Sequence, residues 1–124
     1  MGTSLQGKRI LIVEDEYFIA AELRDALIDR GAAVLGPSGR LEEALAMADE
    51  PIDVALLDVN LGNANSFAVA DRLAGRGVPI LLVTGYDGWA LPAAYRDLPR
   101  ITKPFDQTAV ADEIEQLMMT GAVS

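Results

Sequence analysis

Short apolar runs alternate along the chain with segments whose apolar residues recur at helical spacing. The runs are expected to form strands, because they are short, aliphatic and bounded by turn residues. Strands that alternate with helices are typical of βαβ units, which build a parallel sheet with helices on both faces. We therefore predict an α/β fold, a (βα)5 doubly wound sheet of five parallel strands in the order 2-1-3-4-5. The expected strands are Arg9–Val13, Ala33–Leu35, Val54–Leu57, Ile80–Val83 and Arg100–Thr102.

Helices are expected between the strands, each with an apolar stripe that faces the sheet. Glu16 is expected only to begin the first helix, which Gly31 ends. Ser66 is expected to cap the third helix, and the last helix runs from residue 106 to about residue 119. The four predicted stripes are Ile19, Leu23, Ala26 and Leu27; Leu41, Ala44, Leu45 and Ala48; Phe67, Ala70, Leu73 and Ala74; and Val110, Ile114, Leu117 and Met118.

The segment from residue 87 to residue 97 has a weaker helical pattern. Gly88 and Pro92 interrupt it, and Pro92 fits best in a first helical turn. We expect a short or mobile fourth helix there.

Composition narrows the chemistry that the chain can perform. Its 124 residues include neither Cys nor His, which excludes disulfides, thiolate sites and catalysis by Ser-His-Asp or Cys-His groups. The net charge of −9 argues against binding to nucleic acid or to an anionic membrane, because each needs a basic patch. No stretch approaches the ~20 apolar residues of a membrane span. We expect one cytoplasmic domain over residues 1–124, with a core of about residues 8–119 and no output domain.

Five polar residues follow or close predicted strands. They are Glu14 and Asp15 after the first strand, Asp58 closing the third, Thr84 closing the fourth and Lys103 closing the fifth. Right-handed crossovers place the carboxyl ends of parallel strands at one edge of the sheet, which is where ligands bind in this class of fold. We therefore expect these five side chains to converge.

Three converging carboxylates require a positive partner. Two like unit charges ~4 Å apart repel by about 4 kcal/mol at a surface-like dielectric constant, and a hard divalent cation removes that cost. Magnesium accepts a few carboxylates and leaves positions for phosphate oxygens. Together with the ammonium of Lys103 and the hydroxyl of Thr84, the acids form a set suited to phosphoryl transfer. Each residue taken alone also fits an ordinary turn, helix cap or surface loop.

The motifs around these residues resemble those of the receiver domain of two-component response regulators. They are Val13-Glu14-Asp15, Leu57-Asp58-Val59-Asn60, Val83-Thr84-Gly85 and Thr102-Lys103-Pro104-Phe105. The resemblance covers essentially the whole chain, in the family's order and near its spacing, and implies a flavodoxin-like fold.

The resemblance assigns a role to each site residue. Asp58 would be the phosphoacceptor and would take a phosphoryl group from a phosphohistidine of a sensor histidine kinase. Glu14, Asp15 and Asp58, with the backbone carbonyl of Asn60, would hold Mg²⁺ or Mn²⁺. Thr84 and Lys103 would contact the phosphoryl oxygens.

Three positions are candidates for the conformational switch: Thr84, Tyr86 and Arg100. Receivers commonly carry Tyr or Phe three residues before the lysine, where this chain has Arg100. The segment Leu82-Val-Thr-Gly-Tyr86 is instead similar to the Phe-Ala-Thr-Gly-x-Tyr motif of a receiver subgroup associated with kinases of the HWE type. We therefore expect Tyr86 and the weak fourth helix to carry the response. Gly62, where many receivers have proline, predicts a flexible loop after Asp58.

The expected function is that of a phosphorylation switch, not of an enzyme with an external substrate. Its downstream partner would be a protein target or a phosphotransferase, so that the domain signals by altered contacts or serves as a relay or phosphate sink. Two alternatives stay open. One is a receiver-fold interaction module that works without phosphorylation, and the other is a flavodoxin-like cofactor binder or phosphatase. Neither a Gly-x-Gly-x-x-Gly motif nor a Ser/Thr-rich phosphate loop follows the first strand, which argues against a flavin or dinucleotide site.

Overall fold

The computed structural model describes residues 4–62, 64–85 and 91–121. Five parallel strands form one sheet in the order β2-β1-β3-β4-β5, which confirms the predicted fold and topology. Within the described residues, no helix is long and apolar enough to cross a membrane. The elements are β1 Arg9–Val13, α1 Tyr17–Ile28, β2 Ala33–Ser38, α2 Leu41–Met47, β3 Val54–Asp58, α3 Phe67–Ala74, β4 Ile80–Thr84, the 3-10 turn η2 Ala93–Tyr95, β5 Arg100–Thr102 and α4 Gln107–Gly121.

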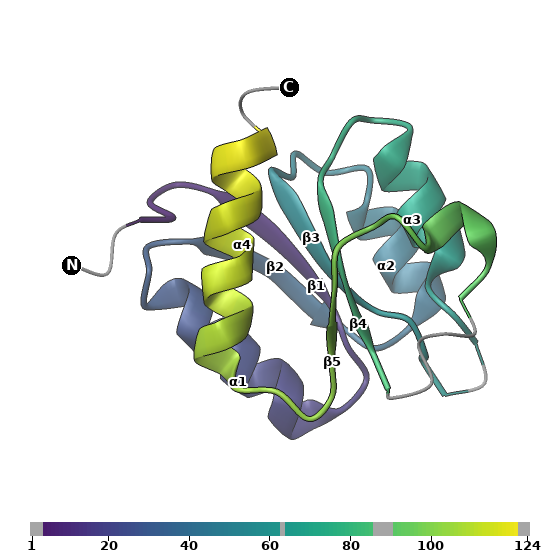
Figure 1. The fold of residues 1–124 in the computed structure, drawn as a ribbon, viewed down its shortest axis with the longest axis horizontal. Helices are drawn as coiled ribbons and strands as arrows, with labels where there is room; N and C mark the ends of the chain where they lie inside the picture. Colours follow the sequence, from purple (N-terminus) through teal and green to yellow (C-terminus); the bar gives the residue numbers. More distant parts are fainter. Residues whose placement is uncertain (1–3, 63, 86–90, 122–124) are drawn as a thin grey trace.

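Helices cover both faces of the sheet (Figure 1). Residues alternate between the two faces of a strand, so Ile10 and Ile12 of β1 pack beneath α1 and α4. Their neighbours Leu11 and Val13 pack on the other face, beneath α2 and α3. All five residues of β3 and all five of β4 are buried, as expected for central strands of a parallel sheet.

The start of α3 differs from the sequence prediction. Ser66 occupies the N-cap position, but its buried hydroxyl has no hydrogen-bond partner. Asn65 takes over the capping contact, since its Oδ1 accepts a hydrogen bond of 3.1 Å from the backbone N–H of Phe67. The predicted inward position of Ala74 is also wrong: Ala74 is exposed, and the helix instead buries Val69 beside Ala70 and Leu73.

The weak fourth segment is reduced to the 3-10 turn η2 in its described part. An aromatic pair attaches this turn to α3, because the ring of Tyr95 stacks on that of Phe67 with centroids 4.3 Å apart and planes 6° apart. The Tyr95 hydroxyl also donates a 2.8 Å hydrogen bond to Asp71. Two interactions with α3 thus hold the turn where a full helix was not favoured by the sequence.

Candidate functional site

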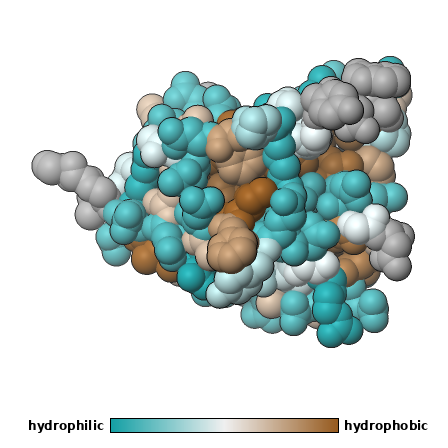
Figure 2. Space-filling model, turned by 90° about the horizontal axis from the view of Figure 1, so that it is seen from below, coloured by the Kyte–Doolittle hydropathy of each residue, from teal (hydrophilic) through white to brown (hydrophobic). Residues whose placement is uncertain are grey.

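The predicted residues lie at one edge of the sheet, at the carboxyl ends of the inner strands β1, β3 and β4 and of the edge strand β5. The register pairs Val13 with Leu57, so Glu14 follows β1 beside Asp58 at the end of β3. Thr84 ends β4, and its backbone carbonyl accepts a 2.7 Å hydrogen bond from the N–H of Lys103. Viewed from below Figure 1, this side of the molecule shows hydrophilic residues around a central hydrophobic patch (Figure 2).

Lys103 connects the acidic residues. Its Nζ lies 3.1 Å from Oε1 of Glu14, 3.1 Å from Oδ2 of Asp58 and 2.5 Å from Oε1 of Glu16. We call these four residues the Lys103 cluster. The acids differ in exposure: the side chains of Glu14 and Asp58 are 1% and 6% exposed, whereas that of Glu16 is 58% exposed.

Glu16 also takes part in the site, which the sequence did not predict. It is the N-cap of α1 as expected, but its carboxylate makes no capping hydrogen bond to the helix and contacts Lys103 instead. Its backbone N–H donates a 3.2 Å hydrogen bond to Oε2 of Glu14, which fixes the two acids relative to each other. A third consecutive acid after β1 was the available signal, but the requirements of a helix start explained it equally well.

Asp15 lies beside this cluster. It is exposed and lines a pocket of about 300 Å³ together with Glu16, Asp58, Asn60, Gly62, Gly85 and Lys103. Carboxylate oxygens of Glu14, Glu16 and Asp58 come within 4.8 Å of one another. The described arrangement therefore brings Glu16 into the group of converging acids and leaves Asp15 at the pocket wall.

The loop after β3 is anchored to the site by its own polar groups. The N–H of Asn60 donates to Oδ1 of Asp58 at 3.1 Å, and Oδ1 of Asn60 accepts from the N–H of Gly62 at 3.1 Å. Gly62 has a φ of +79°, a left-handed conformation that glycine adopts without strain. Asn60 thus borders the pocket and holds one oxygen of Asp58.

Burial makes the site electrostatically costly. Burial and, next, the neighbouring carboxylate of Asp58 raise the pKa of Glu14 from 4.5 to about 8. Burial alone would lower the pKa of Lys103, but hydrogen bonds to Glu16, Asp58 and Glu14 outweigh it and raise that pKa. One cation shared by three acids leaves Glu14 incompletely compensated.

Two buried oxygens at this edge lack hydrogen bonds. Oε1 of Glu14 is close to the Lys103 ammonium but is not aligned for a hydrogen bond, and Oγ1 of Thr84 has no partner. Unsatisfied buried polar atoms are rare in folded proteins and call for an explanation such as an ion or ligand. Carboxylate oxygens are also the ligands that magnesium prefers. The residues present therefore fit a divalent cation and an incoming anionic group.

The three switch candidates differ in location, and the structure describes two of them. Thr84 is buried at the site. Arg100 is exposed on β5, and its Nη1 donates a 3.2 Å hydrogen bond to the carbonyl of Arg96. Tyr86 lies outside the described residues, so its role stays a prediction.

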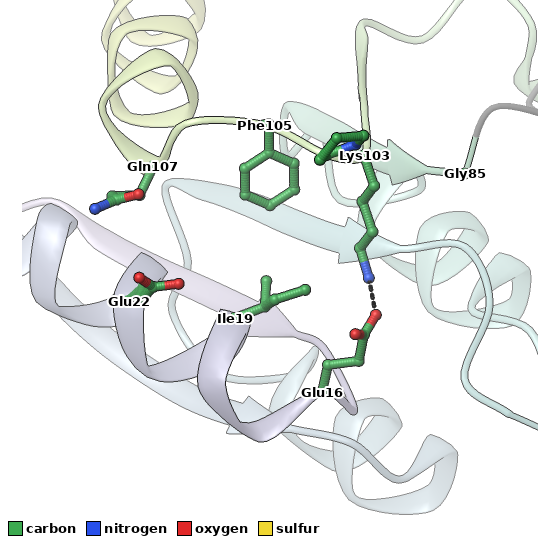
Figure 3. Close-up of a pocket in the computed structure, with 8 residues that line it drawn as sticks. Glu16, Ile19, Glu22, Gly85, Lys103, Phe105 and Gln107 are labelled. Carbon is green, nitrogen blue, oxygen red and sulfur yellow. Dashed lines mark hydrogen bonds and ion pairs between the residues drawn. The ribbon is translucent and has the colours of Figure 1, made fainter.

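A second pocket of about 470 Å³ lies between α1 and the segment that joins β5 to α4 (Figure 3). We call it the α1 groove. Ile19 and Phe105 face each other across it, and Lys103 reaches from its rim to Glu16. Glu16 and Lys103 therefore line both the site pocket and the α1 groove.

Known proteins similar to this chain are receivers and regulators. The family profile described as Response regulator receiver domain matches residues 10–115. Sensory transduction protein LytT of Bacillus subtilis (strain 168) is 34% identical over an alignment of 113 residues that covers 87% of this chain and 47% of LytT. Transcriptional regulatory protein PdtaR of Mycobacterium tuberculosis (strain CDC 1551 / Oshkosh) is 27% identical over 113 residues, 87% of this chain and 55% of PdtaR. The chain thus spans about half the length of these curated relatives.

A solved structure matches over nearly its full length. The solution structure of SdrG from Sphingomonas melonis Fr1 is 36% identical and has a TM-score of 0.75, with 95% of this chain and 98% of SdrG covered.

Proposed function

Because the chain belongs to the response regulator receiver domain family of two-component signalling, we propose that Asp58 is its phosphoacceptor and that phosphorylation there requires a divalent cation. The observation that carries this proposal is the position of Asp58. Asp58 lines the site pocket, and its Oδ2 lies 3.1 Å from the Lys103 ammonium. The neighbouring strand β4 ends at Thr84, whose buried hydroxyl lacks a partner.

The chemistry is a transfer between two nucleophiles. A carboxylate oxygen of Asp58 attacks the phosphorus of a phosphohistidine on a sensor histidine kinase, and a P–O bond forms while the P–N bond breaks. The imidazole of the kinase leaves with the electron pair of the broken bond and takes up a proton. The product on this chain is an acyl phosphate, and the same reaction with acetyl phosphate releases acetate.

The side chains of this domain position the phosphoryl group and compensate its charge. Lys103 donates to one phosphoryl oxygen and Thr84 to another, so that preorganised donors meet the charge as it develops. The N–H of Asn60 keeps the other oxygen of Asp58 in place. Lys103 is already held at the rim by Glu16, so little rearrangement is needed to reach the incoming group.

Glu14, Asp15 and Asp58, with the backbone carbonyl of Asn60, would hold Mg²⁺ or Mn²⁺. The cation supplies positive charge that neutralises the phosphoryl oxygens during transfer. Its presence would also relieve the repulsion that raises the pKa of Glu14.

The proposed partners are a sensor histidine kinase, which the Thr84-Gly85-Tyr86 motif suggests to be of the HWE type, and a downstream protein or phosphotransferase. The domain would act in the cytoplasm, as a phosphoacceptor that assists its own phosphorylation and dephosphorylation.

Intact-mass spectrometry after incubation with acetyl phosphate tests this proposal. Wild-type protein should gain the mass of one phosphoryl group with magnesium and not after chelation, and Asp58→Asn should gain none. An adduct that forms independently of both magnesium and Asp58 would rule out the assignment.

A further inference from the structure

The three acids around Lys103 differ in what else they can do. Glu14 and Asp58 are almost fully buried and belong to the site that would hold the cation and the phosphoryl group. Glu16 is more than half exposed, yet it makes the shortest contact with Lys103, 2.5 Å from Nζ to Oε1. The acid closest to the ammonium is therefore the one that the proposed chemistry does not use.

Lys103 and a divalent cation compete for the same oxygens. In the structure the ammonium lies 3.1 Å from one oxygen of Glu14 and 3.1 Å from one oxygen of Asp58. A cation bound by these two acids would repel the ammonium and reduce their attraction for it. Without a further anionic partner, the charge of Lys103 would be poorly compensated once the cation is bound.

Glu16 meets the requirements of that partner. Its backbone N–H contacts Glu14, so its place beside the site is fixed. Its carboxylate makes no capping hydrogen bond to α1, so α1 loses no capping hydrogen bond when Glu16 pairs with Lys103. Both side chains also line the α1 groove, whose lining does not include Asp58, and Figure 3 shows them paired at its edge.

We propose that Glu16 is a positioning residue that holds the Lys103 ammonium at the rim of the pocket while a divalent cation occupies the oxygens of Glu14 and Asp58. Glu16 thereby lowers the cost of cation binding and keeps Lys103 directed at the phosphoryl group. The inference rests on the proposed function, because it assumes that a cation binds at this edge of the sheet.

A double-mutant cycle on magnesium affinity tests whether Glu16 acts through Lys103. Isothermal titration calorimetry would measure magnesium binding to wild type, Glu16→Gln, Lys103→Met and the double variant, with circular dichroism to verify folding. Glu16→Gln should weaken binding about fivefold when Lys103 is present, the scale expected for coupled neighbouring charges. In the Lys103→Met background the same substitution should change affinity less than twofold.

Glu22→Gln is the matched control. Glu22 lies on the same helix and lines the same groove, so its substitution removes an equal charge nearby. Its magnesium affinity should stay within twofold of wild type. A comparable loss in Glu22→Gln would show that general surface charge, and not the pair with Lys103, sets the affinity, and would overturn the inference.

The remaining outcomes separate this inference from the proposed function. An equal loss from Glu16→Gln in both Lys103 backgrounds would make Glu16 a direct ligand or a general electrostatic contributor, and no loss with Lys103 present would leave it without a role; either result overturns the inference alone. Failure of wild type to bind magnesium would overturn both.

Nuclear magnetic resonance of the lysine ammonium groups gives an independent signature. With magnesium bound, the Lys103 ammonium should remain protected from exchange in wild type and in Glu22→Gln, and its signal should be lost in Glu16→Gln. Equal protection in all three proteins would contradict the proposed position of Lys103.

Discussion

Two clusters in this domain each contain one cation and several acids, but their electrostatics are opposite. In the first, which we call the Arg30 cluster, Nη1 of Arg30 lies 2.8 Å from Asp112 and 2.6 Å from Glu115, and Ser4 also donates to Glu115. The side chains of Asp112 and Glu115 are 65% and 28% exposed. The Ser4 hydroxyl and, after it, Arg30 hold the pKa of Glu115 below its usual value.

In the Lys103 cluster, Glu14 and Asp58 are much more deeply buried than either acid of the Arg30 cluster, and the pKa of Glu14 is raised to about 8. The Arg30 cluster favours the charged form of Glu115 and joins the N-terminal segment, α4 and the turn after α1. The Lys103 cluster disfavours charge on Glu14 and leaves one of its oxygens without a hydrogen bond. Ion pairs that support a fold are satisfied by the chain itself, whereas a ligand site retains an electrostatic cost that its ligand can remove.

The largest expected difference between the clusters concerns phosphorylation. Lys103→Ala should slow phosphorylation of Asp58 by acetyl phosphate roughly 100-fold, the scale for removing one donor that stabilises developing charge. Arg30→Ala also removes a cation from an acidic cluster, but it lies away from the carboxyl edge and should leave the rate unchanged. Phosphate incorporation over time at saturating magnesium measures both. Similar rates for the two variants would contradict the distinction.

The second difference concerns pH. Because the pKa of Glu14 is raised from 4.5 in the unfolded chain to about 8 in the folded protein, folded Glu14 binds more protons than unfolded Glu14 between these pH values. The contribution of Glu14 to stability is therefore fully present below about pH 4.5 and is lost as the pH rises through 8. In Glu14→Gln this loss should be absent, a difference on the order of 5 kcal/mol. Denaturant unfolding without divalent cations, between pH 4.5 and pH 8.5, measures it; parallel profiles for the two proteins would contradict the raised pKa.

The hydroxyls of Thr84 and Ser66 are both buried without a hydrogen-bond partner in the described part of the chain. Replacing either should leave the free energy of unfolding unchanged or raise it by up to about 1–3 kcal/mol, since no hydrogen bond is lost and a buried hydroxyl without a partner is removed. Thr84→Val should nevertheless slow phosphorylation several-fold, because in the proposed mechanism that hydroxyl donates to the phosphoryl group, and Ser66→Ala should not. Equal rates in the two variants would remove Thr84 from the site.

The smallest effect is expected from the Arg30 cluster. Glu115→Gln should lower stability at pH 7 by about 0.5–1 kcal/mol, the range of partly exposed ion pairs. Because the pKa of Glu115 is lowered on folding, this contribution is present above pH 4.5 and is lost as the pH falls through the folded-state pKa. Thermal unfolding at pH 7 and at pH 3 measures it. A loss of equal size at both pH values would show that charge on Glu115 does not matter.

The sequence predicted the fold and the edge of the sheet at which the site lies, because both follow from patterns local to each segment. Arg9–Val13 and Arg100–Thr102 form strands with the expected bounds, while β2 continues three residues further, to Ser38. That extension depends on pairing with β1, where Val13 lies opposite Ser38. Pairing with a distant segment is not visible in the residues of β2 themselves.

Two side-chain roles could not be predicted for a similar reason. Ser66 has the residue type of a cap, but Asn65 reaches the N–H of Phe67 while the Ser66 hydroxyl is buried. Glu16 begins α1 as expected, yet its carboxylate is directed to Lys103, 87 residues away in the chain. The N–H of Phe67 could bond to Ser66 or Asn65, and the Glu16 carboxylate could bond to the start of α1 or to Lys103. Tertiary packing decides between these partners in both cases.

Of the acids in the Lys103 cluster and Asp15 beside it, we propose that only Asp58 accepts the phosphoryl group. Borohydride reduces an acyl phosphate but not a free carboxylate, so trapping the protein after acetyl phosphate treatment and sequencing its peptides by mass spectrometry identifies the modified residue. We predict homoserine at position 58, formed only with magnesium. Reduction at Glu14, Asp15 or Glu16, with Asp58 intact, would contradict the account.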